Sequence, residues 1–257
     1  MKLIQALALS LVLFLCACTT VEETNRRALH IVSQEQLNQM SKEEFERLKK
    51  ESQLSNNSDY HERIRTVIRD LSEVISLDSN QYNFQWDYIL IEDDEIVNAF
   101  ALPGGQIGIY TGLFKVALTK SDLAVVIGHE MAHVIARHGG ERMSQQLLAY
   151  GGSFLLSIRS EDTSPERQRQ LMRAYGLGSK LGFLLPYSRV HEKEADRLGL
   201  YYMTKAGYDP RVAIAFWQRM SEEKSIVLPE LLSTHPSDHN RIAHLKLILE
   251  ELGFSYE

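Results

Sequence analysis

The sequence predicts an α+β fold that is mostly helical and contains a small antiparallel sheet of about three strands. Apolar residues recur at helical spacing over residues 60–77, and the chain after residue 118 has helical patterns almost throughout. Between these parts, residues 84–110 change to aromatic and β-branched runs punctuated by turn residues, which is typical of short strands. A length of 257 residues is enough for one good-sized core.

The first 18 residues have the layout of a bacterial export signal. Lys2 precedes an apolar run that is too short for a comfortable membrane span, and small residues with two cysteines follow. The segment LCAC at residues 15–18 resembles a bacterial lipoprotein box, which implies cleavage before Cys18 and attachment of lipid to it. Thr19, in place of an aspartate, implies export to the outer membrane. We therefore predict a lipoprotein-type signal peptide at residues 1–17; an ordinary cleaved signal or an N-terminal anchor helix is the alternative.

The rest of the chain is expected to divide into a tether and one domain. Residues 18–58 are mostly polar and lack glycine, which predicts a lipidated cysteine followed by a polar tether with helical content. The polar run at 55–59 suits a boundary, so the domain should cover residues 59–257. Its expected elements are a helix at 60–77, strands near 84–92, 96–101 and 106–110, helices near 119–138, 141–158 and 188–205, and two further helices after Asp209-Pro210 and after residues 234–242. Gly139-Gly140 should end the helix that starts near 119, and the glycine-rich segment 175–188 is expected to be a mobile loop.

The charge of the chain argues against a role in nucleic-acid binding. Its formal net charge is −6 at pH 7, and it has no basic block of the kind that follows phosphates. Both cysteines, Cys16 and Cys18, lie in the signal region. An exported domain of this composition would rely on its core or on a metal rather than on disulfides.

His129, Glu130 and His133 lie inside the apolar run of the stretch SDLAVVIGHEMAHVIARHGG, at residues 121–140. His129 and His133 are four residues apart, so on a helix they project from one face and can bind one tetrahedral Zn²⁺. Glu130 is offset from both, which suits a general base beside the metal rather than a ligand. A chance match to this H-E-x-x-H spacing is the alternative, but the apolar helix around it is the context that the motif requires.

A catalytic metal site of this kind needs a third protein ligand. Glu192 and Asp196 are four residues apart in the predicted helix 188–205 and therefore share one face. Glu192 can then reach the metal, and Asp196 can accept the second N–H of a ligating histidine. Glu194 would point elsewhere. A charged, solvated helix is the alternative for this stretch.

Three segments together resemble the zinc metallopeptidases of family 48, which include the CAAX prenyl proteases and HtpX. They are HEMAHVIARH at 129–138, SRVHEKEADRLGL at 188–200 and NAFALPGGQIGIYTGL at 98–113, and the resemblance extends over about residues 60–250. The chain is most similar to the soluble periplasmic lipoprotein branch, and also to the protease domains of outer-membrane assembly peptidases and of the mitochondrial stress protease. The resemblance implies a zincin-like (gluzincin) fold with the sheet beside the active-site helix. It also implies one Zn²⁺ per chain, held by His129, His133 and Glu192, with Asp196 behind them.

The resemblance implies roles for residues outside these two helices as well. An edge strand at the cleft would pair with an extended substrate; its residues are Asn98, Ala99, Phe100, Ala101 and Leu102. His235 would enter the fourth metal position and hold the enzyme latent, although a helix-entry turn with a surface histidine is the alternative. Arg241 would stabilise the oxyanion. The other histidines are assigned to structural or surface positions; they include His138, His191, His239 and His244.

These observations predict a zinc-dependent endopeptidase anchored by lipid to the periplasmic side of the outer membrane. Its substrates would be polypeptides, namely unfolded or misassembled envelope proteins, and the outer-membrane assembly machinery would be a further partner. The alternative is a latent or non-proteolytic zinc lipoprotein that acts as a chaperone or assembly adaptor. Glu130 favours the enzyme, because a structural metal needs no general base. A metal-storage lipoprotein is disfavoured, because the sequence has no further His or Cys clusters.

Overall fold

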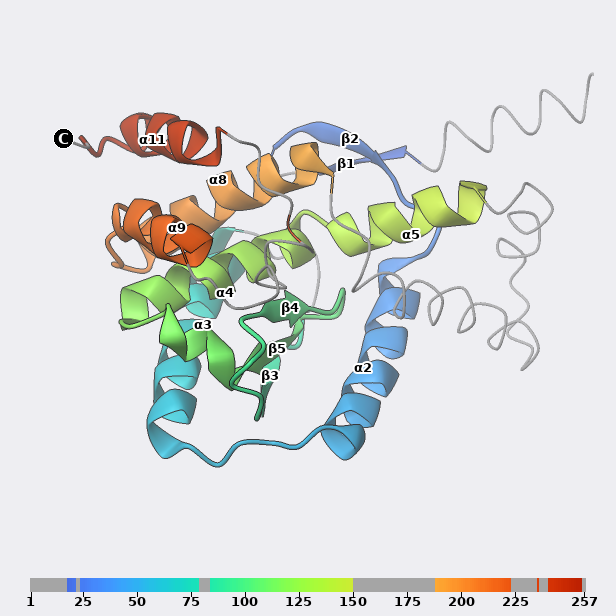
Figure 1. Cartoon of the computed structure of the whole chain (residues 1–257). Helices are drawn as coiled ribbons and strands as arrows, with labels where there is room; N and C mark the ends of the chain where they lie inside the picture. Colours follow the sequence, from blue (N-terminus) through green and yellow to red (C-terminus); the bar gives the residue numbers. More distant parts are fainter. Residues whose placement is uncertain are drawn as a thin grey trace, which may run out of the picture.

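Two helices, α4 (Lys120–Ile135) and α8 (Arg189–Lys205), form the centre of the fold in the computed structural model of the chain (Figure 1). The structure describes residues 18–21, 24–78, 84–149, 188–222, 235 and 240–255. Helix α4 is buried from Asp122 to Ile135. The two helices touch at glycines, since a Cβ atom added to Gly199 would lie 3.0 Å from the carbonyl carbon of Gly128. Such close backbone contact brings the side chains of α8 directly over those of α4.

Helix α4 begins where the sequence predicted but ends earlier. The Thr119 side chain accepts a hydrogen bond from the Asp122 N–H, and the Asp122 carboxylate accepts one from the Thr119 N–H. The predicted end at Gly139-Gly140 is wrong, because Arg137 adopts a left-handed conformation with φ of 55° and a new helix, α5 (His138–Ala149), starts immediately after it. The two glycines instead allow close packing: a Cβ on Gly139 would lie 2.8 Å from the Pro103 ring.

The three predicted strands are present, but the sheet is mixed rather than antiparallel. Its strands are β3 (Asp87–Ile91), β4 (Ala99–Ala101) and β5 (Gln106–Tyr110), in the order β3-β5-β4. Strands β4 and β5 form an antiparallel hairpin, whereas β3 pairs with β5 in parallel. The connection from β3 to β4 therefore carries the chain past the position that β5 later fills. Strand β4 remains at one edge of the sheet, as expected.

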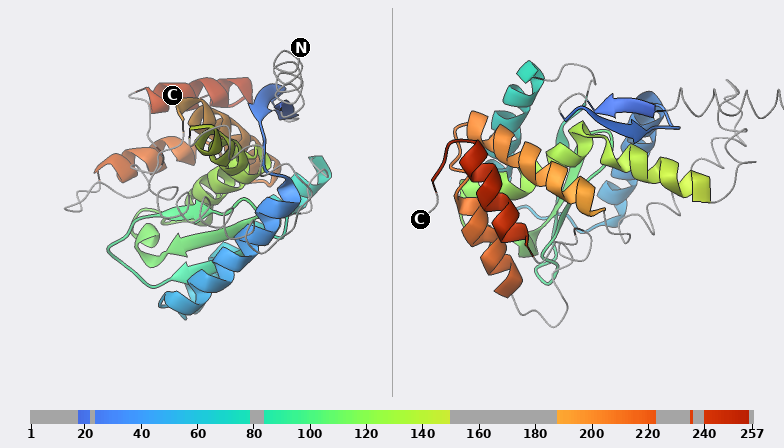
Figure 2. Two further views of the ribbon diagram at one scale, coloured as in Figure 1. Left: turned by 90° about the vertical axis from the view of Figure 1, so that its right-hand side faces the viewer. Right: turned by 90° about the horizontal axis from the view of Figure 1, so that it is seen from above.

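The N-terminal segment, predicted as a polar tether with helical content, is packed against the rest of the chain. Strands β1 (Cys18–Val21) and β2 (Arg26–Leu29) form a hairpin, and α2 (Gln34–Glu51) follows it. Helix α2 runs alongside the three-stranded sheet (Figure 2, left), where Phe45 packs against Ile89, Ile91 and Leu102. Apolar side chains hidden among polar ones therefore hold this segment in place. The predicted helical content is confirmed.

The other helices cover the two central ones. They are α3 (Ser58–Asp78), α9 (Val212–Glu222) and α11 (Arg241–Glu251). Most of the core residues of these helices and of α4 and α8 belong to one apolar cluster. In the described part of the chain, no helix has the length and apolar character needed to cross a membrane. The predicted signal peptide, the end of the helix expected at 141–158 and the glycine-rich segment 175–188 lie outside the described residues, apart from Ser188.

Candidate metal centre

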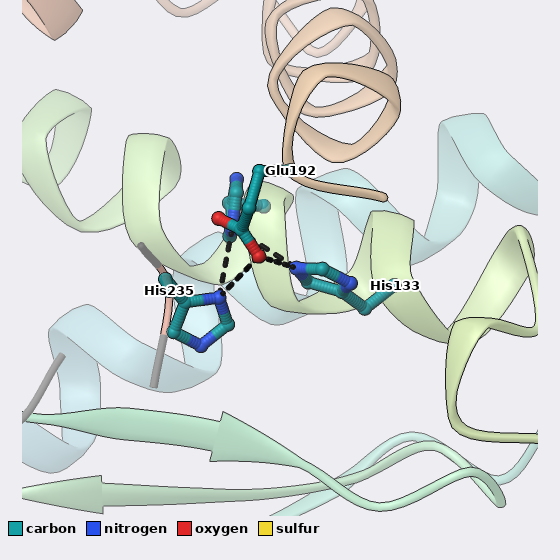
Figure 3. A group of neighbouring side chains, drawn as sticks. His133, Glu192 and His235 are labelled. Carbon is teal, nitrogen blue, oxygen red and sulfur yellow. Dashed lines mark hydrogen bonds and ion pairs between the residues drawn. The ribbon is translucent and has the colours of Figure 1, made fainter. Parts of the chain in front are cut away.

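Four buried side chains from three parts of the chain converge at the contact between α4 and α8. They are His129 and His133 of α4, Glu192 of α8 and His235, which precedes α11. One ligand atom from each lies within 4.8 Å of the others. Figure 3 shows the labelled side chains of His133, Glu192 and His235 pointing toward one another above the sheet.

The Glu192 carboxylate lies at the centre of this cluster. Its Oε2 atom is 3.3 Å from Nε2 of His129, and its Oε1 atom is 3.4 Å from Nε2 of His133. The same Oε1 atom is 3.1 Å from Nδ1 of His235. Although burial opposes the charged form, the neighbouring histidines, His235 first among them, hold the pKa of Glu192 well below its usual range. Glu192 is therefore a carboxylate that faces three imidazoles.

Glu130 lies beside the cluster, at the edge of the sheet. Its Oε1 atom is 3.3 Å from Nε2 of His235, and its carboxylate also accepts a hydrogen bond from the backbone of Ala101 in β4. Burial raises the pKa of Glu130, against the opposing effect of His235 and His129. A buried carboxyl group with a raised pKa binds a proton more readily than an exposed one, which suits a general base.

The donor set fits a divalent metal ion of the zinc type. Three imidazole nitrogens and one carboxylate oxygen are four donors of the kinds that Zn²⁺ binds. Among the described residues, Oε1 of Glu130 and Oε2 of Glu192 are buried without a hydrogen-bond partner. Buried carboxylate oxygens without partners are costly, and a cation in the cluster would compensate Glu192.

Asp196 lies behind His129, as the helix spacing predicted. Its Oδ1 atom is 3.0 Å from Nδ1 of His129 and accepts a hydrogen bond from Nη2 of Arg241. Although burial opposes it, the charge of Arg241 lowers the pKa of Asp196. Although burial opposes the charged form, the carboxylates of Asp196 and Glu192 raise the pKa of His129 to about 9.

Arg241 is held between Asp196 and an aromatic ring. Its guanidinium carbon lies 3.4 Å from the centre of the Trp217 ring. Its Nη1 atom is 3.9 Å from Oε2 of Glu192 and has no hydrogen-bond partner among the described residues. One arm of Arg241 is thus engaged with Asp196, and the other faces the cluster.

Two residues near the cluster, His138 and Glu194, received no role at the site in the sequence analysis. His138 lies 2.8 Å from His133, Nδ1 to Nδ1, and Glu194 lies 2.9 Å from Nε2 of His138. Burial lowers the pKa of His138 to about 4. Burial works against the charge of Glu194, yet His138, Thr24 and Arg26 lower its pKa to about 2. The only sequence signal was the presence of a histidine five residues after His133, and the break at Arg137 removed any helical spacing from it.

The residues predicted for substrate pairing lie in or directly beside β4, and the residue predicted for lipid attachment lies in β1. Ala99, Phe100 and Ala101 form β4, with Asn98 and Leu102 on either side. The Leu102 N–H donates to the Gln106 carbonyl, and the Tyr110 N–H donates to the Asn98 carbonyl. Because hydrogen bonding alternates along an antiparallel pair, the backbone groups of Ala99 and Ala101 face away from β5, toward the edge of the sheet that no described strand covers. Cys18 begins β1.

Comparison with known proteins gives consistent matches along the chain. The model of peptidase family M48 matches residues 58–249. The mitochondrial metalloendopeptidase OMA1 of Bos taurus is 33% identical over 240 residues, which cover 89% of this chain and 45% of that protein. The OMA1 of Schizosaccharomyces pombe is 31% identical over 230 residues, covering 89% of this chain and 65% of that protein. The beta-barrel assembly-enhancing protease of Escherichia coli is 32% identical over 174 residues, covering 64% of this chain and 34% of that protein. The chain thus spans between a third and two thirds of the length of these relatives.

Proposed function

The chain belongs to peptidase family M48, and we propose that it is a zinc-dependent endopeptidase that acts on unfolded or misassembled proteins of the bacterial envelope. The observation that carries this proposal is the buried cluster of His129, His133 and Glu192 with Glu130 beside it. His129, His133 and Glu192 would hold the ion, and His235 is in reach of the fourth position. When bound, Zn²⁺ polarises a carbonyl and lowers the pKa of water at the site.

Glu130 is the group that would move protons. It lies outside the ligand set because it is offset by about 100° from His129 on α4, and its Oε1 atom faces the cluster. Burial raises its pKa, so it can accept a proton from the attacking water and release it to the departing amine. Arg241, with Nη1 aimed toward Glu192, would stabilise negative charge on the substrate carbonyl oxygen.

The open edge of β4 supports a binding mode for an extended chain. The backbone groups of Ala99 and Ala101 face this edge, and Ala101 contacts Glu130 there. A substrate that adds a strand to β4 would therefore lie across Glu130. Backbone pairing of this kind accepts many side-chain sequences, which suits unfolded polypeptides as substrates.

His235 supports a latent resting state. Its imidazole contacts Glu192 on one side and Glu130 on the other, so it lies between the general base and the ligands. A substrate carbonyl would have to displace it. This same contact favours the second candidate function, a non-proteolytic adaptor in which His235 keeps the site closed.

The location of the protein is inferred from the signal region and from its relatives. The lipoprotein box ending at Cys18 supports a lipid anchor, with the domain on the periplasmic side of the outer membrane. The bacterial relative's name links that protein to β-barrel assembly, which supports envelope proteins as substrates and the assembly machinery as a partner. The mitochondrial relatives show that the same domain also occurs outside bacteria.

The test is cleavage of an unfolded protein, such as casein, by the purified zinc-loaded chain. Glu130→Gln should lower the rate by about 10²- to 10⁴-fold while zinc content stays the same, because it removes the proton acceptor and no ligand. Glu44→Gln is a matched control, since Glu44 is also buried but contacts Arg47 on α2.

His235→Ala is the second arm of this test. It should raise the rate of cleavage, because it clears the space between Glu130 and Glu192. Equal rates for the wild type and Glu130→Gln, or no cleavage even in His235→Ala, would favour the adaptor.

A further inference from the structure

The side of His133 that faces away from the cluster contacts residues to which the proposed mechanism gives no role. Nδ1 of His133 is 2.8 Å from Nδ1 of His138, and Nε2 of His138 is 2.9 Å from Oε2 of Glu194. All three side chains are buried. They come from α4, α5 and α8, so this contact joins three helices behind one candidate ligand.

The chemistry of these atoms allows one arrangement of protons. A carboxylate only accepts hydrogen bonds, so Nε2 of His138 carries the proton that faces Glu194. With one proton on each ring, the proton of His138 is this one on Nε2, so its Nδ1 atom accepts from Nδ1 of His133. The remaining lone pair of His133 then lies on Nε2, which faces Glu192. The opposite arrangement would turn an N–H of His133 toward the cluster and prevent it from binding a cation.

The Glu194 carboxylate is itself held by the N-terminal hairpin. Thr24 donates to its Oε1 atom, and Nε of Arg26 lies 2.6 Å from its Oε2 atom. Nη1 of Arg26 also lies 2.8 Å from Glu141 of α5. The His138 ring is flanked on one face by His191, with ring centres 4.3 Å apart. Glu194 and His138 therefore have little freedom to rotate away from His133.

We propose that His138 and Glu194 are positioning residues that form a hydrogen-bond relay, which sets the tautomer of His133 and directs its Nε2 lone pair at the metal. This proposal rests on the proposed function, because it assumes that His133 is a ligand. The relay links metal affinity to residues 24–26, which the sequence had placed in a tether. Neighbours of this kind commonly change metal affinity by about 10- to 100-fold when they are removed.

The experiment measures zinc affinity by competition with a chromophoric chelator, using the purified chain. His138→Leu and Glu194→Ala should each weaken zinc binding by about 10- to 100-fold, because the tautomer of His133 is then no longer set. His138→Asn should retain more affinity than His138→Leu, since its amide oxygen can take the place of Nδ1 as the acceptor. His61→Leu is the control: both ring nitrogens of His61 are also engaged, but with Tyr88 and Ser55.

Nitrogen-15 spectra of the histidine rings provide a second readout that needs no variant. In the wild type they should show His138 protonated at Nε2 and His133 at Nδ1. The opposite tautomers, or equal affinity losses in the Asn and Leu variants of His138, would overturn the relay. A wild type that binds zinc no better than Glu194→Ala does would also overturn it. A wild type that binds no zinc at all would instead overturn the proposed function, and the relay with it.

Discussion

Two of the three imidazoles of the cluster, His129 and His133, lie one turn apart on α4, yet the groups behind them differ in kind. Behind His129 lies a charged pair, Asp196 and Arg241. Behind His133 lies a second imidazole, His138, and only then a carboxylate, Glu194. His129 is thus oriented by direct contact with a carboxylate, whereas His133, which is equally buried, is oriented through a second imidazole.

The pKa values of the two histidines follow this difference. Burial opposes the charge of both rings. Contact with Asp196 and Glu192 nevertheless raises the pKa of His129 to about 9, whereas burial lowers the pKa of His133 well below its ordinary value. The comparison shows that neighbours, rather than burial alone, decide the charge of a buried histidine.

The largest effect is expected from breaking the charged pair of Asp196 and Arg241 behind His129. Asp196→Asn should lower the free energy of unfolding by about 3–5 kcal/mol, because it removes the carboxylate that is hydrogen-bonded to the buried guanidinium of Arg241. Chemical denaturation of the metal-free chain measures this loss. The double variant Asp196→Asn/Arg241→Met should recover much of it, since both charges of this pair are then removed together. A loss below about 1 kcal/mol in the single variant would contradict the view that His129 is supported by a charged pair.

A smaller effect is expected at Arg26, which contacts Glu194 at the outer end of the relay behind His133. Arg26→Met should destabilise the chain by about 1 kcal/mol, because its ion pairs with Glu194 and Glu141 are partly exposed. Loosening of the hairpin should also increase the rate at which trypsin cuts after Arg27, and zinc affinity should fall less than in His138→Leu.

Arg47→Met is the control for this variant, because the described partners of Arg47 are Glu44 and Glu51 of its own helix, α2. If Arg26→Met leaves the rate of cleavage after Arg27 unchanged, the hairpin is held by contacts other than Arg26, and the relay ends at Glu194.

Much of the site could be predicted because its residues are close together on single helices. The four-residue spacing of His129 and His133, and that of Glu192 and Asp196, sets which side chains share a face. The motifs also indicated peptidase family M48, which the comparisons confirm. The mostly helical α+β fold and the edge position of β4 were likewise correct.

The N-terminal segment contains sequence signals for a packed helix, but its polar composition outweighed them in the prediction. Its polar composition indicated a tether, yet Ser33 and Gln36 form a capping box that marks the start of α2. Leu37 and Phe45, eight residues apart, lie on one face of that helix and are buried. Composition describes the average environment of a segment, whereas a few apolar side chains are enough to attach it to a surface.

The sequence by itself determined which residues each helix presents together, because 3.6 residues per turn is a local property of the backbone. Only the tertiary structure decided what meets across elements: the Gly128–Gly199 contact that places Glu192 over the two histidines, the position of His235, and the parallel pairing of β3 with β5. It also placed His138 behind His133, after the turn at Arg137. These contacts depend on how distant surfaces pack, and packing is decided by the whole set of neighbouring side chains rather than by spacing along the chain.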